Sequence, residues 1–322
     1  MLHAIPNFDK IPAKWVYAAM VAFTLITSSV LLLAFRNKLP RDKGREFAVE
    51  GALSAGKPKA AGILFIFAFA IASLVFVPIT IENIAYVIIV LLAMLSGFLD
   101  DKARVPWREY KKGAIDLAIG IVTALTFILY NPDLLSIGIG GFVWQVPKAL
   151  FAVAGIILVW VSINATNCSD GIDGFSGTLS IISMVSIGIS IFLLQTQTNI
   201  LLMTAIMCLS LLPYLWLNAE PSKLLMGDAG SRAIGLFISI AMLKTGNILL
   251  MIPFCFVLLF DGMAGIIKVS LIRFLHLNLL KNIRTPLHDH FRKNKGWSNT
   301  QTIYRLCIIQ VLVSVVTIMF LK

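Results

Sequence analysis

Residues 149–163 read ALFAVAGIILVWVSI, and residues 164–177, directly after them, read NATNCSDGIDGFSG. The first stretch is apolar throughout, as expected for most of a membrane-crossing helix, which needs about 20 residues to span about 30 Å of hydrocarbon. The second stretch is polar and glycine-rich, and it contains two carboxylates, Asp170 and Asp173. The junction predicts a membrane helix that opens into a functional loop.

The composition of the whole chain agrees with a membrane protein. The 322 residues are 58% hydrophobic and 13% charged, whereas a soluble domain carries about 25% charged residues. The net charge of +11 does not indicate a nucleic-acid partner, because in a membrane protein the side on which the charges lie matters more than their sum. The four cysteines have no CxxC spacing, so we interpret them as small hydrophobic residues.

Apolar runs are found along the entire chain. Ten of them approach the length of a membrane span: 15–35, 61–78, 83–99, 113–130, 148–165, 177–195, 199–217, 231–244, 247–272 and 302–321. No cleavage site of the small-residue type follows the first run, so we expect a retained helix and not a signal peptide. The sequence predicts one all-α integral membrane domain, residues 1–322, with about ten transmembrane helices.

The basic residues give this domain an orientation. Loops 36–59, 100–112, 218–232 and 273–301 carry seven, five, two and six Lys/Arg. The opposite set of loops and termini carries only Lys10, Lys14, Lys148, Lys244 and Lys322. By the positive-inside rule the first set is cytoplasmic, so both termini are expected outside. Loop 164–176 has no basic residue, and parity alone places it on the cytoplasmic side.

Four polar clusters share that predicted cytoplasmic face. They are GFLDDKARVP (97–106), NATNCSDGIDGFSG (164–177), NAEPSKLLMGDAGSRAIG (218–235) and TPLHDHFRKNKGW (285–297). Helix capping is one interpretation of Asp228, which precedes an apolar run. It explains Asp100 and Asp101 poorly, because they lie at the C-terminus of a predicted helix, where the macrodipole disfavours negative charge. The concentration of aspartates and histidines on one face indicates an active site.

The residue types suggest the chemistry. Carboxylates without thiolates favour Mg²⁺ over zinc, glycines let the backbone approach a ligand closely, and Lys/Arg bind phosphate. We therefore predict a metal-assisted reaction on a phosphorylated substrate. The alternative is a transporter, supported by Asp116, Asp261 and Lys268 in or near predicted helices. A transporter places its polar residues near the bilayer midplane, whereas these clusters lie in loops on one side.

The order of the motifs, DD, NxxNxxDGxDG, NxxPxxxxMGDxGS and HxHF followed by KGW, resembles the polyprenyl-phosphate N-acetylhexosamine-1-phosphate transferases. The spacing is most similar to the muramoyl-pentapeptide branch. This resemblance implies Mg²⁺-dependent transfer of a phospho-sugar from UDP-MurNAc-pentapeptide to undecaprenyl phosphate, giving lipid I and UMP, in a bacterial cytoplasmic membrane. It also implies ten helices with both ends outside, and homodimers are common in the family. The rival branch uses UDP-GlcNAc, as in teichoic acid or O-antigen synthesis.

The resemblance also implies roles for individual residues. Asp228 matches the principal magnesium aspartate, with Asp173 as a second metal candidate, and Asp100 matches a proposed base for the lipid phosphate. The implied catalytic residues are Asp100, Asp101, Asp228 and His288. The implied substrate-binding residues are Asn167, Asp170, Gly171, Asp173, Asn218, Leu225, Asp289, His290 and Lys111.

Several positions depart from the family pattern. Asp289 stands in the middle of what is usually a run of three histidines, and Leu225 stands where phenylalanine is usual. KPKAAG (57–62) replaces a Thr-Pro-Thr-Met-Gly-Gly motif. The loop after Asp101 is short, which leaves both Lys111 and Lys112 as candidates for a phosphate clamp. The acceptor implies an apolar groove near Asp100, and we expect a long, distorted helix over run 247–272 to form one wall.

Overall fold

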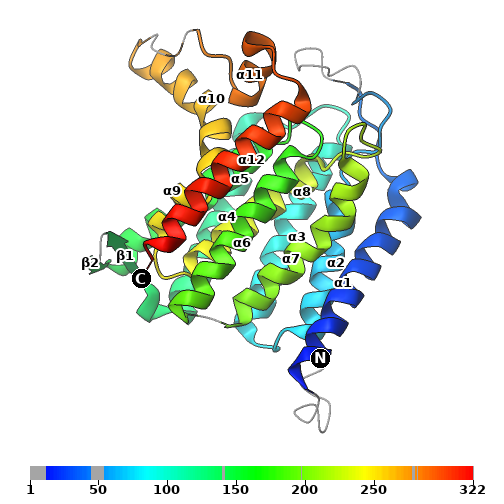
Figure 1. Cartoon of the computed structure of the whole chain (residues 1–322). Coiled ribbons are helices and arrows are strands. Elements are labelled where there is room, and N and C mark those ends of the chain that lie inside the picture. The colour runs from blue at the N-terminus through cyan, green and yellow to red at the C-terminus, as the bar shows by residue number, and fades with distance from the viewer. Residues whose placement is uncertain are drawn as a thin grey trace.

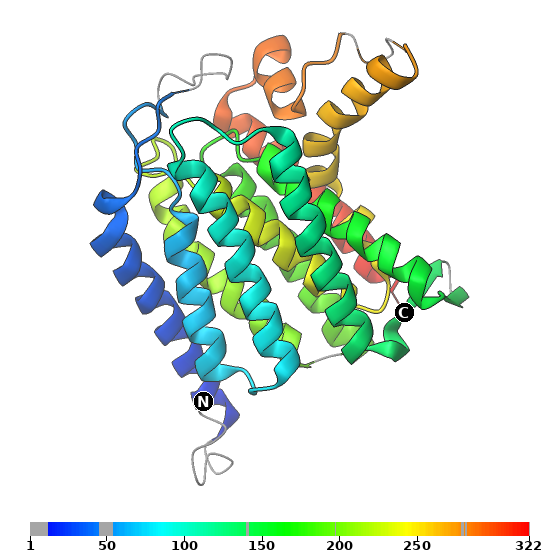
Figure 2. The ribbon, with the colours of Figure 1, turned by 180° about the vertical axis from the view of Figure 1, so that it is seen from behind.

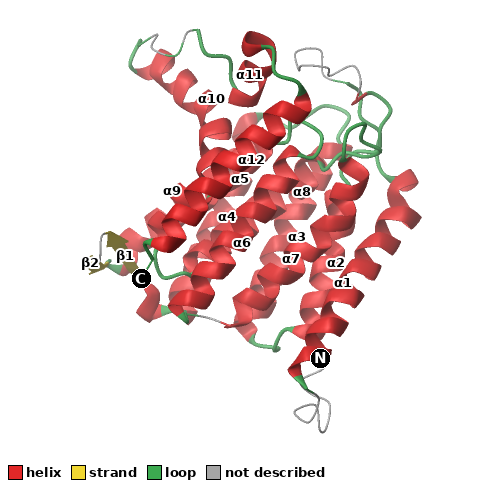
Figure 3. Cartoon of the chain, viewed as in Figure 1, coloured by secondary structure: helices red, strands yellow, loops and turns green. Residues whose placement is uncertain are grey.

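The computed structural model describes residues 12–44, 54–139, 142–196, 198–277, 280 and 282–321. Helices account for most of them (Figures 1 and 3). The helices are α1 (Ala13–Phe35), α2 (Gly62–Phe76), α3 (Ile81–Lys102), α4 (Glu109–Tyr130), α5 (Lys148–Cys168), α6 (Phe175–Leu194), α7 (Thr198–Asn218), α8 (Gly227–Leu243), α9 (Met251–Phe254), α10 (Phe256–Phe274), α11 (Leu287–Lys295) and α12 (Asn299–Met319). Short 3₁₀ turns are η3 (Arg36–Lys38), η5 (Pro132–Leu134) and η6 (Ile248–Leu250). The predicted apolar runs coincide with these helices.

The helices define an integral membrane protein. Seven described helices are long and apolar enough to cross a membrane, or eight if the bent pair η6–α9 and α10 forms one span. Helices α2 and α8 have 15 and 17 residues, which correspond to about 22 and 26 Å, less than the roughly 30 Å of a bilayer core. Almost every residue of α8 is buried, so this helix forms the centre of the bundle.

A β-hairpin and a short polar helix are additions to the predicted all-α fold. Strands β1 (Ser136–Ile139) and β2 (Phe142–Gln145) pair antiparallel between α4 and α5. Helix α11 lies in the last loop, beside α10 (Figure 1). The strands have four residues each, and α11 is a charged helix of nine residues. A hydropathy pattern that identifies membrane spans does not detect elements this short.

The ninth apolar run, for which the sequence predicted one long, distorted helix, is broken into two parts. The chain bends by 93° between Ile248–Phe254 and Phe256–Arg273. Gln310 of α12 supplies hydrogen bonds at the break: its Oε1 accepts from the Val257 N–H (2.9 Å), and its Nε2 lies 3.0 Å from the carbonyl oxygens of Pro253 and Phe254. Inside a bilayer, backbone groups released by a bend need such partners within the protein. One side chain therefore stabilises the bend.

We expect Gln310→Leu to lower the thermal midpoint of the detergent-solubilised protein. The change leaves the Val257 N–H and two carbonyl groups without their side-chain partner, and an unsatisfied buried group costs about 1–3 kcal/mol. Ser314→Ala is the matched control. Ser314 Oγ also lies 3.0 Å from Gln310 Nε2, so the change removes one hydrogen bond of the same amide but leaves the hydrogen bonds to the backbone at the break in place. The control should lose less stability, and an unchanged midpoint for Gln310→Leu would contradict this account.

All four polar clusters lie at one end of the bundle. The connections from α1 to α2, α3 to α4, α5 to α6, α7 to α8 and α10 to α12 are gathered at the upper end in Figure 1. The N-terminal end of α1 and the C-terminal end of α12 lie at the opposite end of the bundle, as the view from behind also shows (Figure 2). The fold thus brings loops that are distant in sequence to a common surface.

Candidate active site

The site begins where α3 meets the first turn of α8. A Cβ atom on Gly97 of α3 would lie 2.2 Å from the carbonyl oxygen of Asp228, a distance that a real side chain cannot adopt. Glycine at this position therefore allows the two backbones to touch. About one turn after Gly97, the last turn of α3 carries Asp100 and Asp101, so this contact brings three carboxylates to the same place.

Lys112 connects two of these carboxylates. Its Nζ lies 2.6 Å from Asp100 Oδ2 and 3.2 Å from Asp228 Oδ2. The other oxygen of Asp100 accepts a hydrogen bond from the Trp107 N–H (2.7 Å), which fixes the loop between α3 and α4. Lys112 thereby holds a positive charge between two negative ones.

Asp101 caps α8 from outside that helix. Its Oδ2 accepts from the Ala229 N–H (3.0 Å), and its Oδ1 lies 2.8 Å from Lys59 Nζ. A carboxylate at a helix N-terminus is stabilised by the free N–H groups and by the macrodipole. Gly227 adopts φ +70°, and a Cβ there would lie 2.4 Å from Asp101 Oδ2, so this position in the MGD motif requires glycine.

Asp228 is held as a charged group. Its Oδ1 accepts from Asn167 Nδ2 (3.0 Å), and the same nitrogen donates to Ser231 Oγ (2.9 Å). Burial alone would raise the pKa of Asp228, but the Lys112 ammonium and the hydrogen bond from Asn167 outweigh it and lower the pKa below its usual range. The side chain is therefore a carboxylate at neutral pH.

The glycine-rich loop is joined to the loop before α8. Asp173 Oδ2 accepts from the Ser222 N–H (3.2 Å) and lies 3.5 Å from Lys57 Nζ. Asn218 Oδ1 accepts from the Gly174 N–H (2.7 Å). Its Nδ2 donates to the carbonyl oxygen of Leu224 (2.8 Å). In this structure Asn218 connects two loops, while Asp173 remains half-buried at the edge of the site.

Backbone pairing places the two lysines of KPKAAG at the site. The Leu225 N–H donates to the Pro58 carbonyl (2.8 Å), and the Ala61 N–H donates to the Leu225 carbonyl (3.0 Å). Lys57 and Lys59 flank Pro58 and reach Asp173 and Asp101, respectively. In the sequence, KPKAAG is only a departure from the family pattern, and the position of these two lysines at the site was not predicted from it.

His288 is oriented by a carboxylate from α10. Its backbone N–H donates to Asp261 Oδ1 (2.7 Å), and its Nδ1 lies 2.8 Å from Asp261 Oδ2. Both side chains are 2% exposed. The opposite nitrogen, Nε2, faces the glycine-rich loop, where a Cβ on Gly171 would lie 2.4 Å from it. The carboxylate of Asp261 within an apolar run, which is also a feature of transporters, is the sequence signal for this orienting role.

The remaining predicted residues lie around this core. Asp289 Oδ1 is 3.8 Å from His288 Nε2 and 3.4 Å from Arg292 Nη1, and His290 Nδ1 accepts from the Arg284 N–H (3.3 Å). Lys111 is exposed, with Nζ 3.4 Å from the centre of the Trp107 ring. Its neighbour Lys112, and not Lys111, reaches the aspartates. Asp170 is half-buried in the loop that contains the exposed Gly171.

The arrangement suits a cation held partly by substrate. Asp228 and Asp173 belong to separate networks, one with Lys112 and Asn167 and the other with Lys57 and Ser222. Within the described part of the chain, no three His, Cys, Asp or Glu residues are grouped as ligands for a metal ion. Mg²⁺ usually takes only one or two carboxylates and completes its shell with water and substrate phosphates.

A membrane bundle with alternating lysines and aspartates at one end defines a class of enzyme that acts on phosphorylated substrates at the membrane surface. The family model for "Glycosyl transferase family 4" matches residues 83–246. A phospho-N-acetylmuramoyl-pentapeptide-transferase of Treponema pallidum (strain Nichols) is 37% identical, covering 92% of this chain and 86% of that protein. Proteins with the same name from Wolbachia pipientis wMel and Campylobacter jejuni (strain RM1221) are each 28% identical, over 82% of the chain and 84% and 81% of those proteins. The chain belongs to glycosyl transferase family 4, within its phospho-N-acetylmuramoyl-pentapeptide-transferase branch.

The Gly97 contact leads to a testable change. We expect Gly97→Ala to displace the first turn of α8 and to lower transferase turnover by about 10²-fold, the cost of a misplacement of about 1 Å in a catalytic group. Gly113→Ala is the control, because nothing lies within 4 Å of a Cβ on that helical glycine. Turnover measured side by side checks this, and equal activities would show that α3 and α8 tolerate separation.

A second change tests the orientation of His288. Asp261→Asn keeps the size of the side chain and an oxygen for the backbone N–H, but it no longer provides a carboxylate for Nδ1. We expect turnover to fall by about 10²-fold through misorientation of the ring, with a smaller effect on the donor KM. Asp261→Glu restores the charge and should recover part of the activity. Full activity in the asparagine variant would contradict a role in orienting His288.

Proposed function

We propose that this chain transfers phospho-N-acetylmuramoyl-pentapeptide from UDP-MurNAc-pentapeptide to undecaprenyl phosphate, releasing UMP and forming lipid I. The relatives named for this activity support the proposal. The observation that carries it is the position of Lys112 between Asp100 and Asp228. This lysine lies between two aspartates at the N-terminus of a buried helix. Such an arrangement suits a substrate with phosphate groups, which the lysine can bind, that arrives together with a divalent cation, which a carboxylate can bind.

The residues present fit Mg²⁺. Asp228 is ionised and sits at the centre of the cluster, and the donor set is oxygen only, as Mg²⁺ prefers. Asp228 would hold the ion, and Asp173 would be a second ligand if the diphosphate draws the two loops together. When bound, Mg²⁺ would neutralise negative charge that develops on the diphosphate as UMP leaves.

The lysines and carboxylates then have separate tasks. Lys59 and Lys112 bind phosphate oxygens of the two substrates as point charges. An oxygen of the lipid phosphate forms a bond with the β-phosphorus of the donor, while the bond from that phosphorus to the bridging oxygen breaks and UMP departs. A lipid phosphate already carries negative charge near neutral pH, so Asp100 chiefly positions Lys112 and the loop at Trp107.

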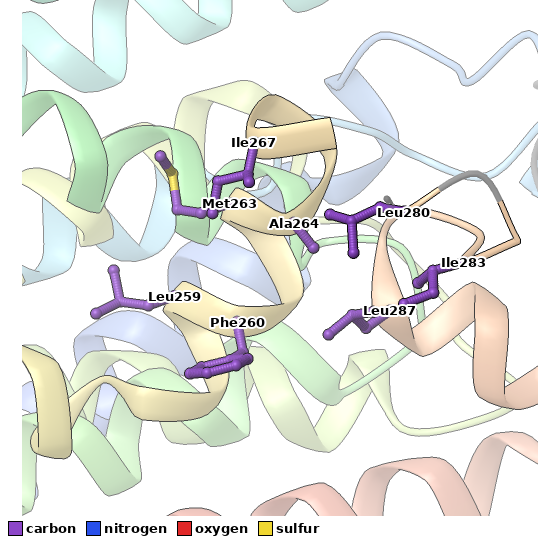
Figure 4. A pocket seen from close by; sticks show the side chains of 8 residues that line it. All are labelled: Leu259, Phe260, Met263, Ala264, Ile267, Leu280, Ile283 and Leu287. Atoms are coloured by element: carbon purple, nitrogen blue, oxygen red, sulfur yellow. The ribbon is translucent and has the colours of Figure 1, made fainter. Parts of the chain in front are cut away.

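An apolar cavity beside His288 suits the acceptor chain. It has a volume of about 500 Å³. The side chains that line it come from α10, the loop before α11 and the first residue of α11, as Figure 4 shows. Leu287 in its wall directly precedes His288, and Phe260 directly precedes Asp261. A polyprenyl chain in this cavity would present its phosphate to the histidine side of the site. In this proposal α10 supplies one wall of the acceptor groove, and the groove adjoins His288.

The same proposal includes the orientation in the membrane. We place the polar end of the bundle at the cytoplasmic face of a bacterial cytoplasmic membrane, with ten spans and both termini outside. The support is that the loops rich in Lys/Arg gather at this end, while the outer ends of α1 and α12 lie at the other (Figure 1). A homodimer stays a prediction of the resemblance.

The test is UMP release by detergent-purified protein given undecaprenyl phosphate, Mg²⁺ and one donor at a time. We expect turnover of UDP-MurNAc-pentapeptide but not of UDP-GlcNAc, and loss of turnover with EDTA. Asp228→Asn should reduce the rate to background, because an amide is a much weaker ligand for Mg²⁺ than a carboxylate.

Each other result has a distinct meaning. Turnover of UDP-GlcNAc alone would keep the chemistry but reassign the donor. Activity that persists in EDTA would remove the metal from the proposal. No UMP from either donor, with the lipid present, would overturn the proposed function.

A further inference from the structure

Below the site, a second pair of charges joins α4 to α8. Lys112 and Asp116 are four residues apart on α4, and Asp228 and Arg232 are four residues apart on α8. Residues at this spacing lie on the same face of a helix, one turn apart. Asp116 Oδ1 and Arg232 Nη2 form an ion pair, and their side chains are 3% and 4% exposed. The pair lies one turn deeper than the contact between Lys112 and Asp228.

The contact between Lys112 and Asp228 and the deeper pair of Asp116 and Arg232 form two layers. From one layer to the next, the sign of the charge on each helix is reversed. Helix α4 presents a positive charge and then a negative one, while α8 presents a negative charge and then a positive one. Both helices begin at the site end and run in the same direction (Figure 1). A shift of α8 by one turn would place Arg232 against Lys112, or Asp228 against Asp116, so that like charges would meet. The pattern therefore stabilises a single register.

This register has to be set by side chains. Helices α4 and α8 each pack closely against α3 and α5, while long charged side chains connect α4 and α8 directly. Helix α5 supports the layer nearer the site, because Asn167 Nδ2 donates to Asp228 Oδ1 (3.0 Å), whereas Asn164 Nδ2 donates to the Trp160 carbonyl of its own helix (2.8 Å).

Stability alone does not account for the deeper pair. A buried ion pair is often no more stable than apolar residues of the same volume, because two charges lose their hydration. Ionisable groups at membrane depth usually serve a function. We propose that Asp116 and Arg232 are positioning residues that hold Lys112 against Asp228 and so fix the carboxylate for a divalent cation. This rests on the proposed function, since it assumes a cation at Asp228.

The test measures cation binding without turnover. Mn²⁺ would be titrated into the detergent-solubilised protein without substrates and its affinity read by electron paramagnetic resonance, alongside thermal midpoints, kcat and KM. The variants are Arg232→Gln, Arg232→Lys and the neutral double variant Asp116→Asn/Arg232→Gln, which leaves no unpaired charge and guards against misfolding. The control is Lys244→Met. Lys244 directly follows α8 at the end away from the site, and its Nζ lies 2.5 Å from Glu82 Oε1, so the change breaks another largely buried ion pair.

We expect the Mn²⁺ Kd to rise and kcat to fall by about 10–100-fold in Arg232→Gln and in the double variant, as for other residues that orient metal ligands. Arg232→Lys should recover much of this loss. Lys244→Met should lower the midpoint and leave the Mn²⁺ affinity unchanged.

Wild-type Mn²⁺ affinity in the folded double variant would overturn the inference while leaving the proposed function intact. The same loss of affinity in Lys244→Met would also overturn it, because the effect would then be one of general stability. Wild-type protein that neither binds Mn²⁺ nor releases UMP would overturn both together.

Discussion

The site depends on the absence of side chains between three helices. At the polar end of the bundle, a Cβ on Gly62 of α2 would lie 2.0 Å from the backbone nitrogen of Gly230 in α8, and Gly97 of α3 touches the Asp228 carbonyl. Backbones that approach this closely hold the first turn of α8 in a rigid position. Asp101 can cap that turn from α3, and Asp228 can face Lys112, only because the glycines permit the contact.

Charge balance is the second organising property. Each aspartate of the cluster already has a basic partner: Lys112 for Asp100 and Asp228, and Lys59 for Asp101. In the proposed reaction the lysines would turn to phosphate oxygens and Asp228 would turn to the metal. A donor diphosphate with two negative charges would arrive with a divalent cation, so this part of the exchange would leave the net charge of the region nearly unchanged and would limit the cost of desolvation on binding.

The sequence predicted the elements better than their contacts. Apolar runs located the helices, and the motif loops were correctly expected to gather on one face, because both properties follow from local composition. A distortion of this run was predicted, but the place and size of the bend were not: Pro213 lies inside an unbroken α7, whereas the chain breaks two residues after Pro253. The difference is that Gln310, distant in sequence, supplies the hydrogen bonds. The pairing of Asp261 with His288 and the positions of Lys57 and Lys59 depend likewise on tertiary contacts that no local pattern contains.

If the cavity beside His288 holds the acceptor, as proposed, the bend between α9 and α10 also decides how the acceptor is supplied. Phe260 and Ile267 line the cavity and are 57% and 50% exposed, so the cavity is open at the surface of α10, a helix that the proposal places in the membrane. A lipid that enters there diffuses in two dimensions and never crosses water. Its effective concentration is then its mole fraction in the bilayer or micelle, and added detergent would dilute it at constant bulk concentration. The enzyme would therefore show surface-dilution kinetics towards the lipid and ordinary saturation towards the soluble donor.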